Sequence, residues 1–302
     1  MTTDPEGRRS PLVSVITATY NMADYLGETL DSVLAQRNAR VESIVVDDGS
    51  TDRTPEVLER YAGDPRVKVV RQSNAGQTRA KNRGLEEATG DFVAFCDADD
   101  TWLPHKLERQ LPRFDVDDPP GLVYADTQFM DEHGNDIETW NPRRYRGRIA
   151  GRLLADNFIP FPTCVSPRKV IEDLGGFDES LTMSIDYDLW LRVAAEHWVD
   201  YVPEVLARYR IWPGQMSHKT GERLDNAFRM TARYVERHPD AVTPTEARKA
   251  WAHTYATRGA WHRREGRLGA AFADYGRSLR HWPLELRTWR MIGAALLRRR
   301  SS

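Results

Sequence analysis

Hydrophobic positions in the first 125 residues alternate between strand-like runs and helix-like stripes. Four short, nearly continuous apolar runs occupy residues 13–17, 41–46, 67–70 and 92–96. Helical patterns separate them, over residues 26–34, 54–61 and 79–88. Strands that are apolar throughout and separated by helices are typical of a mostly parallel sheet covered on both faces. The pattern therefore predicts an α/β fold in which helices flank the sheet.

The pattern changes after residue 125. Residues 131–151 are rich in Asn, Asp, Arg and Gly, include Trp140, and predict a long loop or irregular hairpin. A helix is predicted over 187–195, and only helical patterns remain after about Gly221. We therefore expect a disordered N-terminus over residues 1–10, an α/β domain over 11–217 and an all-helical extension over 218–302.

Charge is distributed unevenly along the chain. The 43 basic and 45 acidic residues nearly cancel, so no global field favours nucleic acid. From Arg248 onward, however, 13 Lys/Arg stand against 3 Asp/Glu, which makes the helical extension basic. Cys96 and Cys164 are too few for a disulfide framework, and no run approaches the ~18–20 apolar residues of a spanning helix. The N-terminus shows no signal-peptide pattern. We expect a soluble, cytoplasmic protein that does not bind nucleic acid.

Polar residues follow three of the predicted strands at the point where each strand ends. These segments are Thr19-Tyr20-Asn21, Asp47-Asp48-Gly49-Ser50 and Asp97-Ala98-Asp99-Asp100. Because parallel α/β sheets bind ligands at the carboxyl ends of their strands, the three segments predict one shared site. Asn74-Ala-Gly76, followed by Lys81-Asn82-x-Gly84, predicts a glycine turn and a cation near the phosphates of a bound nucleotide. Neither a GxGxxG nor a P-loop motif occurs, which removes the main support for dinucleotide and P-loop functions.

Asp97 and Asp99 lie one residue apart at a strand end. Such a pair can hold a hard divalent cation whose other positions stay open to phosphate oxygens, as in a DxD-type site for a nucleotide diphosphate. Two alternatives stay open on the motif alone. The acids could be solvated turn residues, or Asp97-x-Asp99-x-Thr101 could be the nucleophile loop of a haloacid-dehalogenase-like phosphatase, with an aspartyl phosphate on Asp97. Such a phosphatase normally opens with its nucleophile strand, whereas about ninety residues of α/β pattern precede Asp97 here.

Five motifs, in this order, resemble those of the family 2 glycosyltransferases of GT-A fold. They are Pro11 to Asn21, Val45-Val-Asp-Asp-Gly-Ser-Thr-Asp52, Asn74-x-Gly76 with Ala80-Lys-Asn-Arg-Gly84, Phe95-Cys-Asp-Ala-Asp-Asp-x-Trp102, and Gly175-Gly-Phe-Asp178 with Asp186-x-Asp188-Leu-Trp-Leu-Arg192. The resemblance covers about residues 11–215. It is highly specific for the family and much less so for a substrate.

The resemblance implies a role for each matching residue. Tyr20 and Asp48 would hold the nucleotide base, together with the backbone around Ala18. Asp97 and Asp99 would contact ribose and metal, Asp100 being a second metal candidate, and Asp186 falls where the family keeps its catalytic base. Two departures stand out: Ile185 replaces a frequent Glu, and Trp212 stands where many members have a His, so it cannot ligate metal or phosphate.

The resemblance implies an inverting glycosyltransferase that uses a UDP- or dTDP-linked sugar, and the acidic cluster agrees with the use of Mn²⁺ or Mg²⁺. Its acceptor would be a hydroxyl of a glycan or lipid-linked molecule in polysaccharide or cell-envelope biosynthesis, with Trp140, Phe161 and Trp212 as candidate acceptor residues. One base without an obvious nucleophile favours single displacement with inversion. The alternatives are a sugar-nucleotide-binding protein that transfers nothing and, with less support, the aspartyl-phosphate phosphatase.

The helical extension carries two further patterns. Gly259, Gly266, Ala271, Tyr275 and Pro283 match several positions of a tetratricopeptide-like repeat, and one copy predicts a helical hairpin. Apolar residues then form a stripe over 286–297, with arginines around and after it. Such a helix suits the anionic inner face of the cell membrane, or it docks on the protein's own surface with the arginines merely solvated. The pattern leaves both open.

Overall fold

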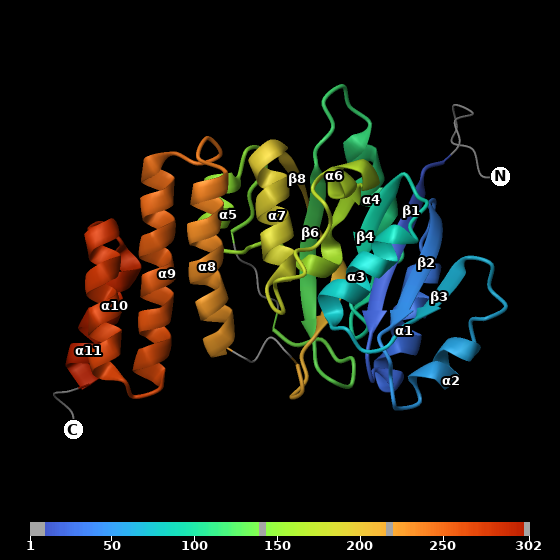
Figure 1. Ribbon diagram of the computed structural model, residues 1–302, viewed down its shortest axis with the longest axis horizontal. Helices are drawn as coiled ribbons and strands as arrows, with labels where there is room; N and C mark the ends of the chain where they lie inside the picture. The colour runs from blue at the N-terminus through green and yellow to red at the C-terminus, as the bar shows by residue number, and fades with distance from the viewer. Residues whose placement is uncertain (1–9, 139–142, 216–219, 299–302) are drawn as a thin grey trace. The chain divides into compact units, whose positions relative to one another are not determined.

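The computed structural model describes residues 10–138, 143–215 and 220–298 (Figure 1). The predictions for residues 1–9, for Trp140 and for residues 299–302 lie outside these ranges. No helix in the described ranges combines the length and apolar character that a membrane crossing requires. The chain divides into two compact units: 1–148 with 158–215, and 149–157 with 216–302.

The first unit is built on a mixed sheet in the order β3-β2-β1-β4-β7-β6-β8-β5. Its strands are β1 (Leu12–Thr19), β2 (Arg40–Asp47), β3 (Val67–Arg71), β4 (Phe92–Phe95), β5 (Thr101–Trp102), β6 (Leu122–Met130), β7 (Val165–Pro167) and β8 (Val199–Arg210). β3, β2, β1 and β4 are mutually parallel, as are β6 and β8. β7 pairs antiparallel with β4 and β6, and β5 pairs antiparallel with β8. The predicted α/β fold with a mostly parallel sheet is confirmed.

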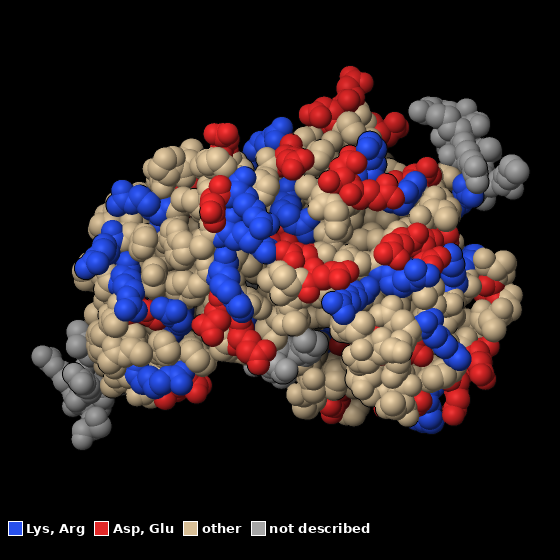
Figure 2. Space-filling model, in the orientation of Figure 1, with Lys and Arg blue, Asp and Glu red and all other residues tan. Residues whose placement is uncertain are grey.

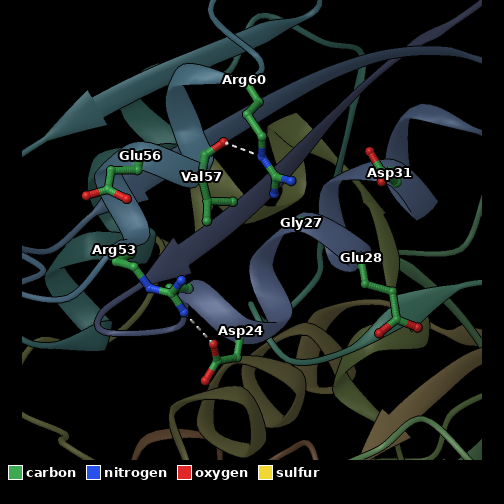
Figure 3. Close-up of a pocket in the computed structure, with 9 residues that line it drawn as sticks. Asp24, Gly27, Glu28, Asp31, Arg53, Glu56, Val57 and Arg60 are labelled. Carbon is green, nitrogen blue, oxygen red and sulfur yellow. Dashed lines mark hydrogen bonds and ion pairs between the residues drawn. The ribbon is translucent and has the colours of Figure 1, made fainter.

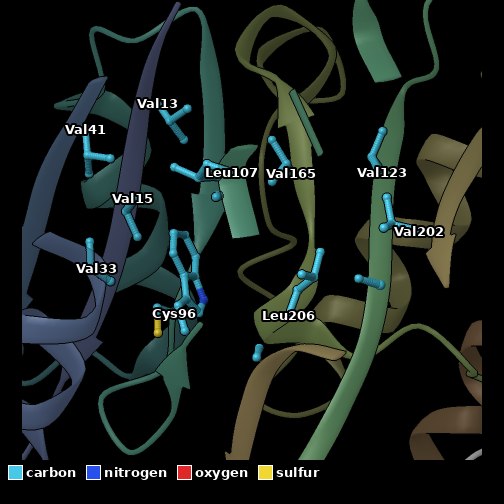
Figure 4. Packing of buried hydrophobic residues seen from close by; sticks show 14 of the residues in the cluster. Val13, Val15, Val33, Val41, Cys96, Leu107, Val123, Val165, Val202 and Leu206 are labelled. Carbon is cyan, nitrogen blue, oxygen red and sulfur yellow. The ribbon is translucent and has the colours of Figure 1, made fainter. Parts of the chain in front are cut away.

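Helices cover both faces of this sheet. They are α1 (Ala23–Leu34), α2 (Thr54–Glu59), α3 (Gln77–Glu86), α4 (Lys106–Gln110), α6 (Arg168–Asp173) and α7 (Ile185–Glu196), with short 3₁₀ turns at Leu111–Phe114 and Phe161–Thr163. Adjacent residues of β1 point to opposite faces of the sheet. Val15 packs in a buried cluster with Val33 of α1 (Figure 4), whereas Ile16 lies against Gly84 of α3. A Cβ at Gly84 would lie 2.5 Å from Ile16 Cγ2, so glycine permits the close approach of α3 to β1.

The second unit is helical. It contains α5 (Ala150–Ala155), α8 (Thr220–Arg237), α9 (Pro244–Arg264), α10 (Leu268–His281) and α11 (Leu286–Arg298). α9 and α10 form a hairpin whose turn uses Gly266 at φ +74°, and a capping box of Thr243 and Glu246 begins α9. The unit also takes α5 from the middle of the chain, because Gly151 of α5 lies directly against the Glu246 side chain. The sequence pattern alone places that segment with the α/β domain.

Candidate active site at the carboxyl ends of the strands

The loops after β1 and β2 are joined by hydrogen bonds at one edge of the sheet. Asp48 N donates to Thr19 O at 2.9 Å, which aligns the two strand ends. Asn21, with φ 54°, accepts from the backbone N–H groups of Thr51 and Asp52 at 2.7 and 3.2 Å. Tyr20 is 44% exposed, so its ring is available as a flat apolar surface. Ala18 lies half-buried two residues earlier in β1.

Asp48 fixes the loop that leads into α3. Its carboxylate accepts from Gln72 Nε2 at 2.8 Å, from Ala75 N at 2.8 Å and from Gly76 N at 2.9 Å. The side chain is only 3% exposed. Asp48 therefore shapes the rim of the site through the backbone of residues 72–76.

Lys81 and Asp97 form a buried ion pair at the centre of the site. Lys81 Nζ lies 2.8 Å from Asp97 Oδ1, and the lysine side chain is 5% exposed while the aspartate is 34% exposed. The same Nζ lies 4.8 Å from the centre of the Phe161 ring. Phe161 is itself buried, in an aromatic cluster with Phe95, Phe177 and Trp190. The acceptor role of Phe161 stays a prediction; in the structure its ring supports Lys81.

Asp99 and Asp100 are bound to the end of β8 through Arg210. The Arg210 backbone N donates to Asp100 Oδ1 at 3.0 Å, and its Nε donates to Asp99 O at 2.9 Å. The guanidinium group also pairs with Glu28 Oε2 at 2.5 Å and lies 4.7 Å from the centre of the Tyr25 ring. Arg210 is 1% exposed. The loop after β4 and the end of β8 are therefore held together by one buried cation.

The carboxylates of Asp97, Asp99 and Asp100 provide the donor chemistry of a divalent-cation site. Burial raises the pKa of Asp99 and places the pKa of Asp100 well above its usual range, and the neighbouring carboxylates add to both effects. Asp100 Oδ2 is buried without a hydrogen-bond partner among the described residues. Within the same residues, no three His, Cys, Asp or Glu side chains are grouped to hold a metal alone. The donor set fits a cation whose other positions are filled by phosphate oxygens of a ligand.

Trp212 also binds the acidic loop. Its Nε1 donates to Asp99 Oδ2 at 2.8 Å, and Gln215 Nε2 lies 3.4 Å from the same oxygen. The acceptor role predicted for Trp212 is not tested by these contacts. They show that the indole N–H is directed at Asp99.

Asp186 lies in the first turn of α7, where the charges of both Lys81 and Asp97 act on its carboxyl group. Its pKa is raised, mainly by burial and further by the charge of Asp97, while Lys81 acts in the opposite direction. Three side chains of α3 hold the segment that leads to Asp186. Thr78 Oγ1 donates to Leu181 O at 2.7 Å, Gln77 Nε2 to Thr182 O at 3.0 Å, and Asn82 exchanges two hydrogen bonds with the Phe177 backbone.

Asp188, two residues after Asp186 and therefore on a different face of α7, is bound into the scaffold. Its Oδ2 lies 2.8 Å from Arg192 Nε, and the same guanidinium donates to Leu174 O and Gly176 O at 2.8 and 2.7 Å. Gly176 has φ +70°, which favours glycine at this turn. The Asp188–Arg192 pair therefore fixes the Gly175–Gly176 turn, and Asp186 is the aspartate of this helix that faces the site.

Sequence patterns did not single out Arg210, Glu28 or Gln215. Arg210 contacts Glu28 across 182 positions and Asp99 across 111 positions of the chain. Hydrophobic periodicity predicts local helices and strands, and it cannot predict contacts between residues so far apart in the sequence. An available signal was the position of Arg210 two residues before Trp212, in the segment where many members of the family have a His.

A surface hollow of about 710 Å³ lies between α1 and α2 (Figure 3). Its lining is largely charged: Asp24, Glu28, Asp31, Arg53, Glu56 and Arg60, beside Ala23, Gly27 and Val57. None of the predicted site residues lines it. It is a groove beside the site described above and not the site itself.

Sequence comparisons relate this chain to known glycosyltransferases. The family model described as "Glycosyl transferase family 2" matches residues 14–175. An uncharacterized glycosyltransferase of Methanocaldococcus jannaschii is 31% identical over 207 residues, covering 67% of this chain and 71% of that protein. The putative teichuronic acid biosynthesis glycosyltransferase TuaG of Bacillus subtilis is 50% identical over 103 residues, covering 33% of this chain and 41% of that protein.

Two solved structures share the fold. TarS of S. aureus in complex with UDP-GlcNAc superposes with a TM-score of 0.68 at 18% identity, covering 89% of this chain and 81% of that one. The mannosyltransferase PcManGT from Pyrobaculum calidifontis, in complex with GDP-Man and Mn²⁺, gives 0.66 at 22% identity, covering 95% and 81%. The chain thus has the GT-A fold, and it belongs to glycosyl transferase family 2, as an enzyme of the transferase class.

Proposed function

We propose that the protein is an inverting, metal-dependent glycosyltransferase that uses a UDP- or dTDP-linked sugar. It transfers the sugar to a hydroxyl group of a glycan or lipid-linked acceptor in polysaccharide or cell-envelope biosynthesis. The observation that carries the proposal is the convergence of Asp186, the Lys81–Asp97 pair and the Asp99–Asp100 loop at one edge of the sheet. Among the residues that the structure describes at this edge, we identify one candidate base and no activated nucleophile, which supports direct displacement at the anomeric carbon with inversion.

Asp186 serves as the general base in this proposal. A base must be deprotonated and yet have a pKa near the working pH, and burial moves the pKa of Asp186 in that direction. Lys81 keeps the carboxylate ionised by its charge. The acceptor hydroxyl would lose its proton to Asp186 as its oxygen attacks the anomeric carbon, and the sugar–phosphate bond would break on the opposite side.

Asp99 is the main candidate for holding Mn²⁺ or Mg²⁺, with Asp97 and Asp100 beside it. A bound divalent cation supplies electrostatic stabilisation of the charge that develops on the departing diphosphate. Support for metal use comes from the related fold of PcManGT, which was solved with GDP-Man and Mn²⁺. Independent support comes from the two buried, adjacent carboxylates of Asp99 and Asp100, whose charged forms a bound cation would stabilise.

The nucleotide binds along the ends of β1 and β2 in this proposal. Tyr20 offers its exposed ring to the base, with the Ala18 backbone alongside, and Asp48 contributes by fixing residues 72–76. Lys81 lies beside Asp97, where ribose and phosphate groups would arrive. TarS was solved with UDP-GlcNAc, which supports a uridine donor. The acceptor residues Trp140, Phe161 and Trp212 remain predictions.

The proposed biological role rests on the relatives. TuaG is described as a putative teichuronic acid biosynthesis glycosyltransferase, which supports a cell-envelope polysaccharide as the product. We place the reaction in the cytoplasm, where sugar nucleotides are available.

We further propose that α11 contacts the inner face of the cell membrane. Leu284, Leu286 and Trp289 are 72%, 68% and 53% exposed, and Arg287 and Arg290 beside them are exposed as well. Trp289 Nε1 donates to Pro283 O at 2.8 Å, so the polar group of the indole is already paired and its free surface is apolar. Exposed apolar side chains among arginines match an anionic bilayer surface.

Asp186→Asn tests the catalytic assignment. We expect transfer to fall by about 10²–10⁴-fold, because the proton acceptor is lost. Binding of the sugar nucleotide with Mn²⁺, measured by calorimetry after a thermal-shift screen of UDP-, dTDP- and GDP-sugars, should stay within about twofold of wild type, since Asp186 does not hold the donor. The matched control is Asp173→Asn at an exposed position of α6, which should change neither quantity. Near-normal turnover of Asp186→Asn contradicts the assignment.

The same experiment separates the alternatives. A protein that binds sugar nucleotides tightly but transfers and hydrolyses none of them is a binding protein. Hydrolysis of a generic phosphate ester that disappears in Asp97→Asn would favour the phosphatase, which the family membership opposes.

A further inference from the structure

The indole of Trp212 is held rigidly in front of Asp99. Its Nε1 lies 2.8 Å from Asp99 Oδ2, and its ring centre lies 5.9 Å from that of Tyr25. On another side the chain returns past the ring at Gly214, where a Cβ would lie 2.0 Å from Trp212 Cζ3. Gln215 N donates to Trp212 O at 3.2 Å and closes this turn. The ring therefore has little freedom to leave Asp99.

An indole N–H is a donor without an acceptor lone pair, so Trp212 cannot bind a cation itself. It can act only through the group that accepts its hydrogen bond. That group, Asp99, is only 9% exposed, so its carboxylate needs hydrogen bonds in place of the water that burial removes. Hydrogen bonds to a ligating carboxylate orient it and commonly change metal affinity 10–100-fold.

We propose that Trp212 is the positioning residue of the metal site, acting through its hydrogen bond to Asp99 Oδ2. The indole N–H holds one carboxylate oxygen, so that the carboxylate is presented in a single orientation to the cation. Gln215 assists from 3.4 Å as the weaker of the two donors. This role rests on the proposed function, because it requires a cation at Asp99.

Trp212→Phe removes the N–H and keeps the aromatic contact with Tyr25. We expect the Kd for Mn²⁺, measured by electron paramagnetic resonance in the presence of saturating UDP, whose phosphates complete the site, to rise about 10–100-fold. Gly214→Ala is a second, independent route: it displaces the indole by steric clash without removing its N–H, and it should also weaken Mn²⁺ binding.

The matched control is Trp198→Phe. Trp198 Nε1 donates to Asp118 O at 3.1 Å, and this residue precedes β8, at the opposite end of that strand from Arg210. Its loss removes an indole hydrogen bond of the same kind and should leave Mn²⁺ binding unchanged.

The outcomes separate this role from the metal site itself. If wild type binds Mn²⁺, Asp99→Asn loses it, and a folded Trp212→Phe binds as wild type or tighter, the positioning role is wrong and the metal site stands. If wild type binds no Mn²⁺, or Asp99→Asn binds it as well as wild type does, the metal site at Asp99 is wrong and the positioning role with it. Should Trp212→Phe fail to fold, Gly214→Ala decides the question by the same measurement.

Discussion

The amine of Lys106 is buried in the core of the first unit. The side chain is 0% exposed, and Nζ lies 4.0 Å from the centre of the Trp102 ring with no hydrogen-bond partner among the described residues. Burial lowers its pKa from 10.5 to about 7. The cation–π contact with Trp102 offsets only part of the cost of desolvating the charge.

The stability of the first unit should therefore depend on pH through Lys106. Between about pH 7 and 10 the unfolded chain binds this proton and the folded chain does not, so the free energy of unfolding rises with pH in that window. Lys106→Met should raise the free energy of unfolding at pH 7 by about 2–4 kcal/mol and flatten its rise towards pH 10. Urea unfolding of both proteins at pH 7, 8.5 and 10 measures this. The control is Lys169→Met, at an exposed lysine, which should leave the pH dependence of the free energy of unfolding unchanged. If Lys106→Met and wild type show the same pH dependence, the Lys106 amine is not desolvated in the folded protein.

At the level of elements, the hairpin of α9 and α10 offers a paired test of packing. Gly259 of α9 lies against Tyr275, where an added Cβ would come within 2.6 Å of the ring. Gly276 of α10 has open space around it. Gly259→Ala should destabilise the helical unit by about 1–3 kcal/mol, because a buried ring must move. Gly276→Ala should stabilise it by roughly 0.5–1 kcal/mol, because alanine lowers the entropy cost of the helix. Thermal unfolding followed by circular dichroism compares the two, and a stable Gly259→Ala would mean that the two helices are not closely packed at this point.

The strands that the sequence predicted are those whose hydrophobic run is nearly continuous and is set between helical patterns. β1 to β4 were found within a few residues of their observed bounds because runs such as Val13–Thr17 are apolar on both faces. The antiparallel insertion of β7 between β4 and β6 was not predicted, because Val165 pairs with Ala94 across 71 positions and with Val123 across 42 positions (165 − 94 and 165 − 123). The site shows the same division. The acidic loop and Lys81 are visible as motifs, whereas the contact of Trp212 with Asp99 spans 113 positions and exists only in the folded chain.

At the scale of the whole molecule, charge separates along the chain. Residues from Arg248 onward carry a net charge of +10, and residues 1–247 carry −12. Arginine and lysine side chains are spread over the C-terminal helices on the face shown in Figure 2. An anionic surface would therefore attract the helical unit and repel the acidic part of the chain. Part of the basic charge serves packing instead, since Arg258 and Arg277 both bind the buried Asp274.

Vesicle binding through α11 follows from this distribution. The full-length protein should co-sediment with vesicles containing phosphatidylglycerol at low salt, and much less at about 1 M salt, where the Debye length falls to ~3 Å. Neutral phosphatidylcholine vesicles should bind little, because each arginine near an anionic surface contributes about 1 kcal/mol. The double variant Leu286→Gln/Trp289→Gln should lose at least tenfold in partitioning, since both side chains are exposed and their apolar surface would enter the bilayer interface. Ile137→Gln, at an exposed apolar residue of the first unit, is the matched control and should bind as wild type. If wild type stays in the supernatant at low salt, or the double variant binds equally well, α11 does not contact the membrane.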